Sequence, residues 1–343
     1  MAKAYGRWEI DSDGSIGEGG QAHVFRVRDR ENPSHCRALK RLRNPQRIDR
    51  FRREFDIVRK LDHPGIIRIL DGSVGSDDAW YVMELMGGGN LGTRAAEFKG
   101  DIKASLELLL AMSEAVSVAH ARGVTHRDLK PANVLFRDKA SRAPVVCDFG
   151  IGFIEGEPRL TQTDEAVGPR DFIAPELEGG RSDRIGEYND IYSLGKLLYF
   201  VITGGTVLPR ERHRELHFDL RRRLTSNDYV SVESCQLEYV SRILDHMVAE
   251  NVEERYATLY QCEGVMRLVL RLVREGRYPT TDHMPCRFCG LEEYKVKLPG
   301  QGLVPENEVW MHCERCGHVD RFVGIGLFAR KNSIDGPPRS WNL

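Results

Sequence analysis

One run of eight residues brings together a carboxylate, a cation and an amide: His126-Arg127-Asp128-Leu129-Lys130-Pro131-Ala132-Asn133. Twenty residues beyond Asp128, Asp148 follows three apolar residues and precedes Phe149-Gly150. A carboxylate can act as a general base, a lysine can face a phosphate, and carboxylate and amide oxygens bind divalent cations. Asp128, Lys130, Asn133 and Asp148 are therefore candidates for phosphate chemistry at a metal ion.

A glycine-rich segment near the N-terminus could contact the same phosphates. It reads Gly17-Glu18-Gly19-Gly20-Gln21-Ala22-His23-Val24 and lies between two predicted strands. Glycines let a backbone approach phosphates closely and present N–H groups to them. Taken alone, the segment is more typical of a tight hairpin that binds no ligand.

A lysine on the third predicted strand needs an anionic partner. Lys40 ends the run Ala38-Leu39-Lys40, sixteen residues after Val24. An ammonium group in apolar surroundings is costly unless an anion lies beside it. Glu54, on the next predicted helix, is the candidate partner, and the alternative is an exposed pair worth under ~1 kcal/mol.

The elements that must position these residues fall into two parts. Residues 7–42 alternate as strands do, and from Asp49 onward Phe51, Phe55, Val58 and Leu61 form one apolar helical stripe. Further strands are predicted at 66–70 and 80–85, and further helices near 104–121, 187–203, 236–248 and 258–275. A strand-rich first third followed by a helical body predicts an α+β chain with two unequal lobes.

In this order and at this spacing, the motifs resemble those of the eukaryotic-type (Hanks-type) serine/threonine protein kinases. Ala174-Pro175-Glu176, which begins twenty-six residues after Asp148, completes the pattern. The resemblance covers residues 8–276. It implies the bilobal protein-kinase fold, with a β-rich N-terminal lobe and a helical C-terminal lobe. It also implies an enzyme that uses ATP and Mg²⁺ to phosphorylate serine or threonine on protein substrates.

The resemblance further implies a role for each matching residue. Lys40 holds the nucleotide phosphates and is oriented by Glu54. Asp128 orients the substrate hydroxyl, Lys130 faces the γ-phosphate, and Asn133 and Asp148 hold Mg²⁺. The residues expected around the nucleotide are Gly17, Glu18, Gly19, Gly20, Gln21, Ala22, Val24, Ala38, Lys40, Met83, Glu84 and Met86.

Three further matching residues are expected to support the scaffold rather than the chemistry. Glu176 resembles the acid that pairs with a late arginine, here Arg255. Asp190 resembles the helix aspartate that supports the catalytic loop. All the residues that phosphoryl transfer requires are present, which favours an active enzyme over a kinase-like scaffold or pseudokinase.

Two features bear on specificity and regulation. Lys130 is typical of serine/threonine kinases, whereas Gly168-Pro169 resembles tyrosine kinases, so a dual-specificity kinase is the alternative. A small-molecule kinase is disfavoured because such enzymes lack Ala-Pro-Glu. Thr161 and Thr163 are the candidate autophosphorylation sites, because Arg127 precedes Asp128. The alternative is that both are ordinary loop threonines.

Two CxxCG motifs follow a predicted linker at residues 277–285. Their spacing predicts a four-cysteine Zn²⁺ site made of Cys286, Cys289, Cys313 and Cys316. The segment 286–330 resembles a zinc ribbon, and residues 331–343 are expected to form a loose tail. Disulfides are the alternative. Six basic residues balance six acidic ones, so we expect a structural or protein-docking role and no nucleic-acid binding.

Composition excludes several classes of protein. The 343 residues are 41% hydrophobic and 29% charged with a net charge of -1, which excludes a disordered chain and a strongly basic polyanion-binding protein. The N-terminal residues carry no apolar segment typical of a secretory signal, and no stretch approaches the ~20 apolar residues of a membrane span. We therefore expect a cytoplasmic protein with no membrane partner.

Overall fold

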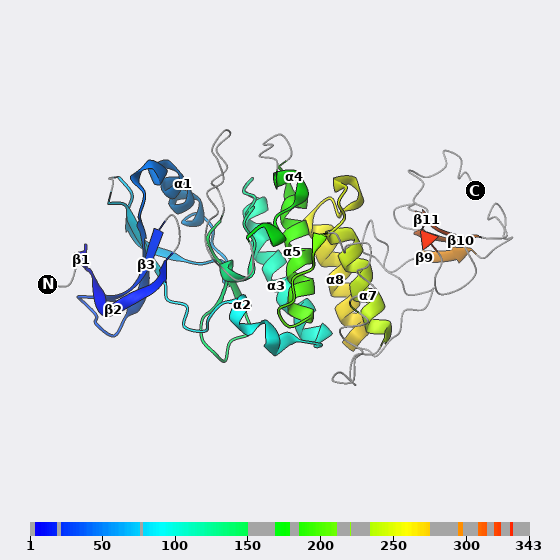
Figure 1. The fold of residues 1–343 in the computed structure, drawn as a ribbon, viewed down its shortest axis with the longest axis horizontal. Coiled ribbons are helices and arrows are strands. Elements are labelled where there is room, and N and C mark those ends of the chain that lie inside the picture. Colours follow the sequence, from blue (N-terminus) through cyan, green and yellow to red (C-terminus); the bar gives the residue numbers. More distant parts are fainter. Residues whose placement is uncertain are drawn as a thin grey trace.

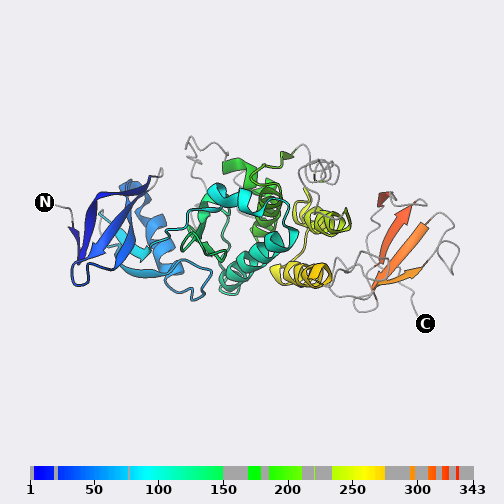
Figure 2. The same ribbon diagram turned by 90° about the horizontal axis from the view of Figure 1, so that it is seen from below.

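The structure is a computed structural model in which an N-terminal sheet is followed by a body of helices (Figure 1). It describes residues 4–18, 22–75, 78–149, 169–178, 185–210, 220, 234–274, 294–297, 308–313, 319–323 and 330–331. In the view turned by 90°, the sheet and the helices again occupy separate parts of the molecule (Figure 2). The two lobes expected from the sequence are therefore confirmed.

The N-terminal lobe is a six-stranded antiparallel sheet with the order β1-β2-β3-β4-β6-β5. Its strands are β1 (Ala4–Tyr5), β2 (Trp8–Glu18), β3 (Ala22–Asp29), β4 (Cys36–Leu42), β5 (Ile69–Ser73) and β6 (Trp80–Glu84). A short 3₁₀ helix, η1 (Pro45–Arg47), leads into α1 (Ile48–Val58). The Asn44 side chain accepts a hydrogen bond from Gln46 N and so caps this entry.

Helix α1 packs against one face of the sheet through the predicted stripe. Phe51, Phe55 and Val58 are all buried, and the rings of Phe51 and Phe55 lie 5.1 and 6.0 Å from that of Tyr81 on β6. A separate cluster covers the other face and consists of Tyr5, Trp8, Val27, Leu39 and Val82. The sheet is therefore covered on both faces at its inner strands β4 and β6.

One predicted strand is wrong in its bounds. The apolar residues 66–70 were expected to form it, but β5 spans Ile69–Ser73. Ile66 and Ile67 are buried elsewhere: Ile66 forms an isolated parallel bridge with Val146, and Ile67 N donates to Val146 O at 2.9 Å. These two residues tie the sheet to the second lobe, which is why they are apolar.

The second lobe is built around α3 (Ile102–His120) and α5 (Glu187–Ile202). Its other elements are α2 (Leu91–Arg94), η2 (Ala95–Phe98), η3 (Pro131–Asn133), β7 (Val134–Phe136), β8 (Pro144–Val146), η4 (Pro169–Phe172), α4 (Pro175–Glu178), α7 (Ser234–Met247), η6 (Val252–Glu254) and α8 (Leu259–Arg274). All four predicted helices in this region are confirmed. Strands β7 and β8 pair antiparallel and hold the loops that carry Asp128 and Asp148.

Helices α5 and α7 approach closely at Gly195. A Cβ there would lie 2.6 Å from Met247 Cβ and 2.8 Å from Val248 Cγ1. Gly195→Ala should therefore force the helices apart and lower the free energy of unfolding by about 1–2 kcal/mol, despite the better helix propensity of alanine. Urea unfolding tests this, with Gly75→Ala as control because nothing lies within 4 Å of that position. Equal stability of the two variants would contradict the prediction.

Near the C-terminus, four strands form a separate antiparallel sheet with the order β12-β11-β10-β9. They are β9 (Tyr294–Lys297), β10 (Glu308–Cys313), β11 (Val319–Val323) and β12 (Arg330–Lys331). In sequence, β9 lies between the two cysteine motifs, and β10 runs into the second of them. Cys313 ends β10, whereas Cys286, Cys289 and Cys316 lie outside the described residues.

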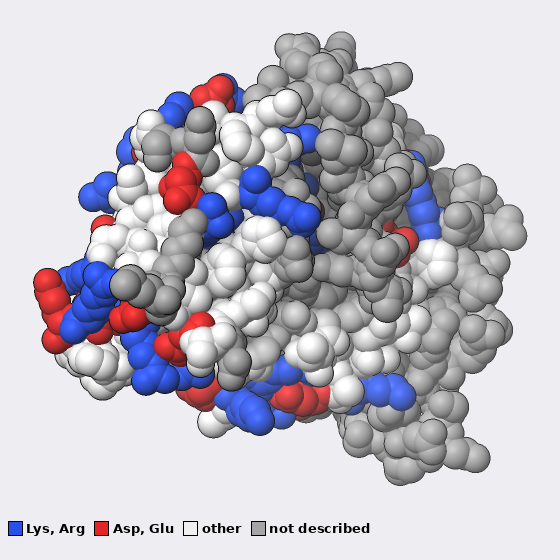
Figure 3. Space-filling view, turned by 60° about the vertical axis from the view of Figure 1, so that its left-hand side comes forward, with Lys and Arg blue, Asp and Glu red and all other residues white. Residues whose placement is uncertain are grey.

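The described surface mixes charges of both signs. On the face shown in Figure 3, blue Lys and Arg side chains lie beside red Asp and Glu side chains along the left and lower edges. Asp11, for example, accepts from Arg28 at 2.7 Å and lies 3.2 Å from Arg26. Across the described residues, every helix is too short or too polar to cross a bilayer.

Candidate active site

Three charged side chains from different elements meet where the two lobes join. Lys40 comes from β4, Glu54 from α1, and Asp148 follows β8. Lys40 Nζ donates to Glu54 Oε1 and to Asp148 Oδ1, at 2.7 Å in each case. The Lys40 and Glu54 side chains are 11% and 13% exposed, whereas that of Asp148 is 45% exposed and open to a ligand. The predicted Lys40–Glu54 pair is thus confirmed as a largely buried one.

The protonation states of this cluster follow from the mutual attraction of its members. Burial alone would lower the pKa of Lys40, but the carboxylates of Asp148 and Glu54 outweigh it and hold that pKa well above its usual range. Burial alone would raise the pKa of Asp148, but Lys40 outweighs it and lowers that pKa. At neutral pH the site therefore presents an ammonium group beside an ionised carboxylate.

Backbone conformation and packing fix Asp148 in place. Its φ of 56° lies in the left-handed region, which non-glycine residues seldom adopt. The next residue, Phe149, is 2% exposed, and its ring lies 4.6 Å from that of His126. His126 Nε2 also lies 3.0 Å from Cys147 O. These contacts position the Asp148 carboxylate toward Lys40.

The loop between α3 and η3 assembles the other predicted residues. Asn133 Nδ2 donates to Asp128 O at 2.8 Å and to Asp128 Oδ2 at 3.1 Å. Lys130 Nζ lies 3.4 Å from the same Oδ2. One carboxylate oxygen of Asp128 is therefore held by an amide and an ammonium group, and the side chain stays 32% exposed.

The oxygen atoms of Asn133 and Asp148 suit Mg²⁺. Because the Asn133 amide nitrogen donates to Asp128, its Oδ1 is left as an acceptor. Mg²⁺ prefers oxygen ligands and is commonly held by one or two protein side chains together with substrate phosphates. Within the described residues, no group of three or more His, Cys, Asp and Glu side chains could hold a metal by itself. The donor set therefore fits Mg²⁺ that binds with a phosphorylated substrate.

As predicted, Asp190 on α5 supports the loop that contains Arg127 and Asp128. Its Oδ2 accepts from His126 N and its Oδ1 from Arg127 N, each at 2.8 Å. Arg127 has a φ of 63°, so these two bonds hold a strained turn of the backbone. His120 on α3 contacts Asp190 Oδ2 at 2.7 Å through Nε2.

The His120–Asp190 contact makes stability depend on pH. Burial would lower the pKa of His120, but Asp190 and then Glu187 outweigh it and raise that pKa. The stabilisation is then full below the ordinary histidine pKa of about 6.5 and is lost as pH rises through the raised value. His120→Gln should therefore lower Tm more at pH 6 than at pH 9. A loss of Tm that is the same at both pH values would contradict this.

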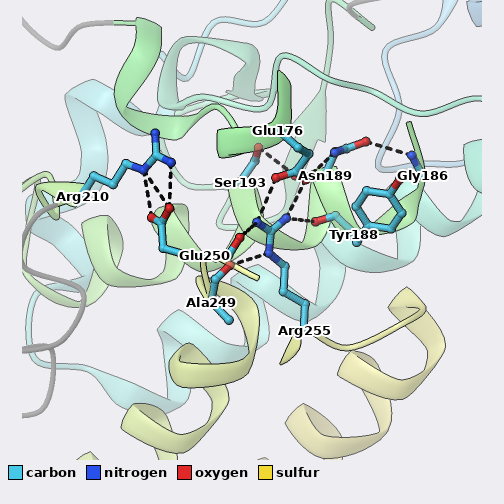
Figure 4. Close-up of polar contacts among 9 residues, drawn as sticks. All are labelled: Glu176, Gly186, Tyr188, Asn189, Ser193, Arg210, Ala249, Glu250 and Arg255. Atoms are coloured by element: carbon cyan, nitrogen blue, oxygen red, sulfur yellow. Dashed lines mark hydrogen bonds and ion pairs between the residues drawn. The ribbon is translucent and has the colours of Figure 1, made fainter. Parts of the chain in front are cut away.

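A buried ion pair anchors the start of α5 (Figure 4). Arg255 Nη1 and Nη2 donate to Glu176 Oε1 and Oε2 at 2.7 and 3.0 Å, and Arg255 Nε donates to Ala249 O at 2.7 Å. The two side chains are 0% and 6% exposed. Asn189 Nδ2 also donates to Glu176 Oε1, at 2.5 Å. The predicted Glu176–Arg255 pair is confirmed.

The remaining residues predicted to surround a nucleotide lie on neighbouring strands and on the segment after β6. In the register, Ala38 faces Met83, Val24 faces Lys40 and Gly17 faces Val24. Glu84 ends β6, and Met86 follows in the connection to the second lobe. Gly19, Gly20, Gln21, Thr161 and Thr163 lie outside the described residues.

The structure brings two further side chains to the site, those of Tyr81 and Cys147. Tyr81 donates from its hydroxyl to Glu54 Oε1 at 2.8 Å, and no motif pointed to it. The feature that marks Tyr81 as part of the site is its position directly opposite Lys40 in the register of β4 and β6. Cys147, which directly precedes Asp148, is 5% exposed, and burial raises the pKa of its thiol well above the usual range. Cys147 is therefore a packing residue.

Comparison with known proteins agrees with this geometry. A family model described as "protein kinase domain" matches residues 10–265. "Serine/threonine-protein kinase PkaA" of Streptomyces coelicolor is 34% identical over 244 residues, which cover 64% of this chain and 45% of that protein. "Serine/threonine-protein kinase PknB" of Mycobacterium tuberculosis is 29% identical over 276 residues, covering 77% of this chain and 42% of the relative. The chain thus spans less than half the length of these two relatives.

Solved structures show the same fold. The kinase domain of PknI from Mycobacterium tuberculosis matches with a TM-score of 0.56. The match covers 78% of this chain and 98% of that one, at 20% sequence identity. At that identity the similarity concerns the fold alone.

Proposed function

Since the chain belongs to the protein kinase family, we propose that it is an active serine/threonine protein kinase that transfers the γ-phosphate of ATP to protein hydroxyls. The observation that carries this proposal is the Lys40 ammonium group, paired at 2.7 Å with both Glu54 and Asp148. Phosphoryl transfer depends mainly on positioning and on neutralising charge. The described residues provide both.

Each residue has a distinct task in the proposed reaction. Lys40 binds the phosphates of ATP and is kept in place by Glu54, while Asn133 and Asp148 would hold Mg²⁺, which neutralises phosphate charge when bound. Asp128 accepts a hydrogen bond from the substrate hydroxyl and orients it toward the γ-phosphate. Lys130, which lies 3.4 Å from Asp128 Oδ2, is near enough to face the phosphate that moves.

A serine or threonine acceptor is favoured over tyrosine. Lys130 contacts the Asp128 carboxylate, and this lysine is the feature of the sequence that is typical of serine/threonine kinases. Pro169, the feature that resembles tyrosine kinases, begins η4. A dual-specificity kinase therefore remains the alternative for substrate choice, and a scaffold that binds nucleotide without turnover is the alternative for activity.

The direct test is transfer of label from γ-³²P-ATP with Mg²⁺ to casein by the purified full chain, followed by acid hydrolysis. We expect phosphoserine or phosphothreonine. Phosphotyrosine beside these products would favour dual specificity. Bound ATP without any transfer would favour the scaffold.

We further propose that phosphorylation of Thr161 or Thr163 activates the enzyme. What supports this is Arg127, whose Nε is buried without a hydrogen-bond partner in the described residues. Burial also lowers the pKa of this guanidinium, so an anionic group nearby would stabilise it. Phosphosite mapping of the active enzyme, with Thr161→Val and Thr163→Val variants, tests the proposal. An active enzyme with neither threonine modified would contradict it.

For the C-terminal region we propose a zinc ribbon that docks a protein partner. What supports it is the spacing of Cys286, Cys289, Cys313 and Cys316, together with the sheet whose strand β10 ends at Cys313. A module this small needs a metal to fold stably.

Zinc content of the purified full chain tests this part of the proposal. One Zn²⁺ per chain is expected, and Cys286→Ser with Cys289→Ser should remove it, whereas Cys36→Ser should not. Retained kinase activity and solubility in the double variant would favour docking over a structural role. A chain without zinc would contradict the ribbon.

A further inference from the structure

Tyr81 lies among residues that have a role in phosphoryl transfer, yet it belongs to none of their motifs. It is a residue of β6, is 2% exposed, and faces Lys40 directly in the antiparallel β4–β6 register. Residues directly opposite each other on neighbouring strands point to the same side of a sheet. Both side chains therefore extend toward α1.

The hydroxyl of Tyr81 and the ammonium group of Lys40 converge on one oxygen of Glu54. Tyr81 Oη donates to Glu54 Oε1 at 2.8 Å, and Lys40 Nζ donates to the same oxygen at 2.7 Å. Lys40 Nζ also lies 5.7 Å from the centre of the Tyr81 ring. Hydrogen bonds to a charged group are stronger than those between neutral groups.

The sheet and α1 are in close contact at this point. A Cβ on Gly72, which faces Tyr81 in the β5–β6 register, would lie 2.6 Å from Phe55 Cε2. The Tyr81 ring itself packs against Phe51 and Phe55 of α1. Burial and the Glu54 carboxylate raise the pKa of Tyr81 well above its usual value, so the hydroxyl keeps its proton and donates.

We propose that Tyr81 is a positioning residue, which holds Glu54 and with it helix α1 in the place where Glu54 orients Lys40 toward ATP. Lys40 alone leaves Glu54 with one donor from the sheet, and Tyr81 supplies a second from the neighbouring strand. The Lys40–Glu54 pair is thereby supported by a contact that does not involve the nucleotide. The part that concerns ATP rests on the proposed kinase function, whereas the position of α1 does not.

Tyr81→Phe tests the proposal because it removes the hydroxyl and keeps the ring between Phe51 and Phe55. Tyr5→Phe is the matched control, since Tyr5 is buried in the cluster on the opposite face of the same sheet. Hydrogen–deuterium exchange of the full chain without nucleotide should show amides of residues 48–58 exchanging about 10-fold faster in Tyr81→Phe and unchanged in Tyr5→Phe. Thermal unfolding of both variants separates this local effect from a global loss of stability.

Kinetics provide the second readout. The kcat/KM for ATP should fall about 10-fold in Tyr81→Phe. In a Glu54→Ala variant, adding Tyr81→Phe should change kcat/KM less than about 2-fold, because Glu54, the acceptor of the Tyr81 hydrogen bond, is already absent. An equal loss in both backgrounds, or α1 exchange that matches that of Tyr5→Phe, would overturn the proposal. If the wild-type protein transfers no phosphate, the kinase function fails and the exchange measurement still decides the role of Tyr81.

Discussion

Lys40→Met is expected to lower kcat/KM for phosphoryl transfer by about 10²–10³-fold, the cost of removing one preorganised electrostatic group. Two carboxylates, Glu54 and Asp148, share this lysine at 2.7 Å each. Without it they repel each other, and the pKa of Asp148 rises because Lys40 is what outweighs its burial. The variant therefore loses its phosphate contact and also binds Mg²⁺ more weakly at low pH.

Steady-state rates between pH 5 and pH 8 check this prediction. The acidic limb of the profile should move to higher pH in Lys40→Met, in addition to the overall loss. Lys60→Met is the control, since Lys60 is exposed just beyond the end of α1. A Lys40 variant with a rate near that of the control would contradict the role of the cluster.

Arg255→Met is expected to lower the free energy of unfolding by about 3–5 kcal/mol, because it leaves a buried carboxylate without its partner. The Glu176 side chain is 6% exposed, and Arg255 supplies two of its hydrogen bonds. Arg255 also donates to Ala249 O and Tyr188 O, so these two carbonyls lose a donor as well.

Urea unfolding of single and double variants measures two contributions to the free energy of unfolding. One is the loss caused by a buried charge without a partner, and the other is the net stabilisation by the ion pair. Arg255→Met with Glu176→Gln should cost less than the sum of the two single changes, because no buried charge is left alone. Arg267→Met is the control, since its pair with Glu114 is 54% and 38% exposed and is worth under ~1 kcal/mol. Additive losses, or an Arg255 variant as stable as the control, would contradict the role of the buried Glu176–Arg255 pair.

The sequence allowed the Lys40–Glu54 pair and the packing of α1 to be predicted from elementary chemistry. A lysine on an apolar strand needs an anion, and Phe51, Phe55 and Val58 could share a face only on a helix. The roles of Asp190 and Arg255 came from family resemblance instead. Their partners lie 63–64 and 79 residues away in sequence, a separation that periodicity cannot bridge.

Other features could not be predicted, for physical reasons. Tyr81 lies in an apolar strand, where a tyrosine is indistinguishable from a core aromatic residue until the register places its hydroxyl beside Glu54. The bounds of β5 were wrong because Ile66 and Ile67 are apolar for a contact between lobes rather than for the sheet. Cys36 is half-buried at the start of β4, where its sulfur accepts a hydrogen bond from Arg26 at 3.4 Å, a contact that no sequence pattern indicates.

Single-turnover transfer of γ-³²P from ATP, by the wild-type chain and by Asp148→Asn prepared in parallel, tests the central claim most directly. We expect label on protein serine or threonine with the wild type and a rate at least about 10²-fold lower with Asp148→Asn. ATP binding measured without Mg²⁺ should differ little between the two. Equal rates for both proteins, or no transfer by a wild-type chain that binds Mg²⁺ and ATP, would contradict it.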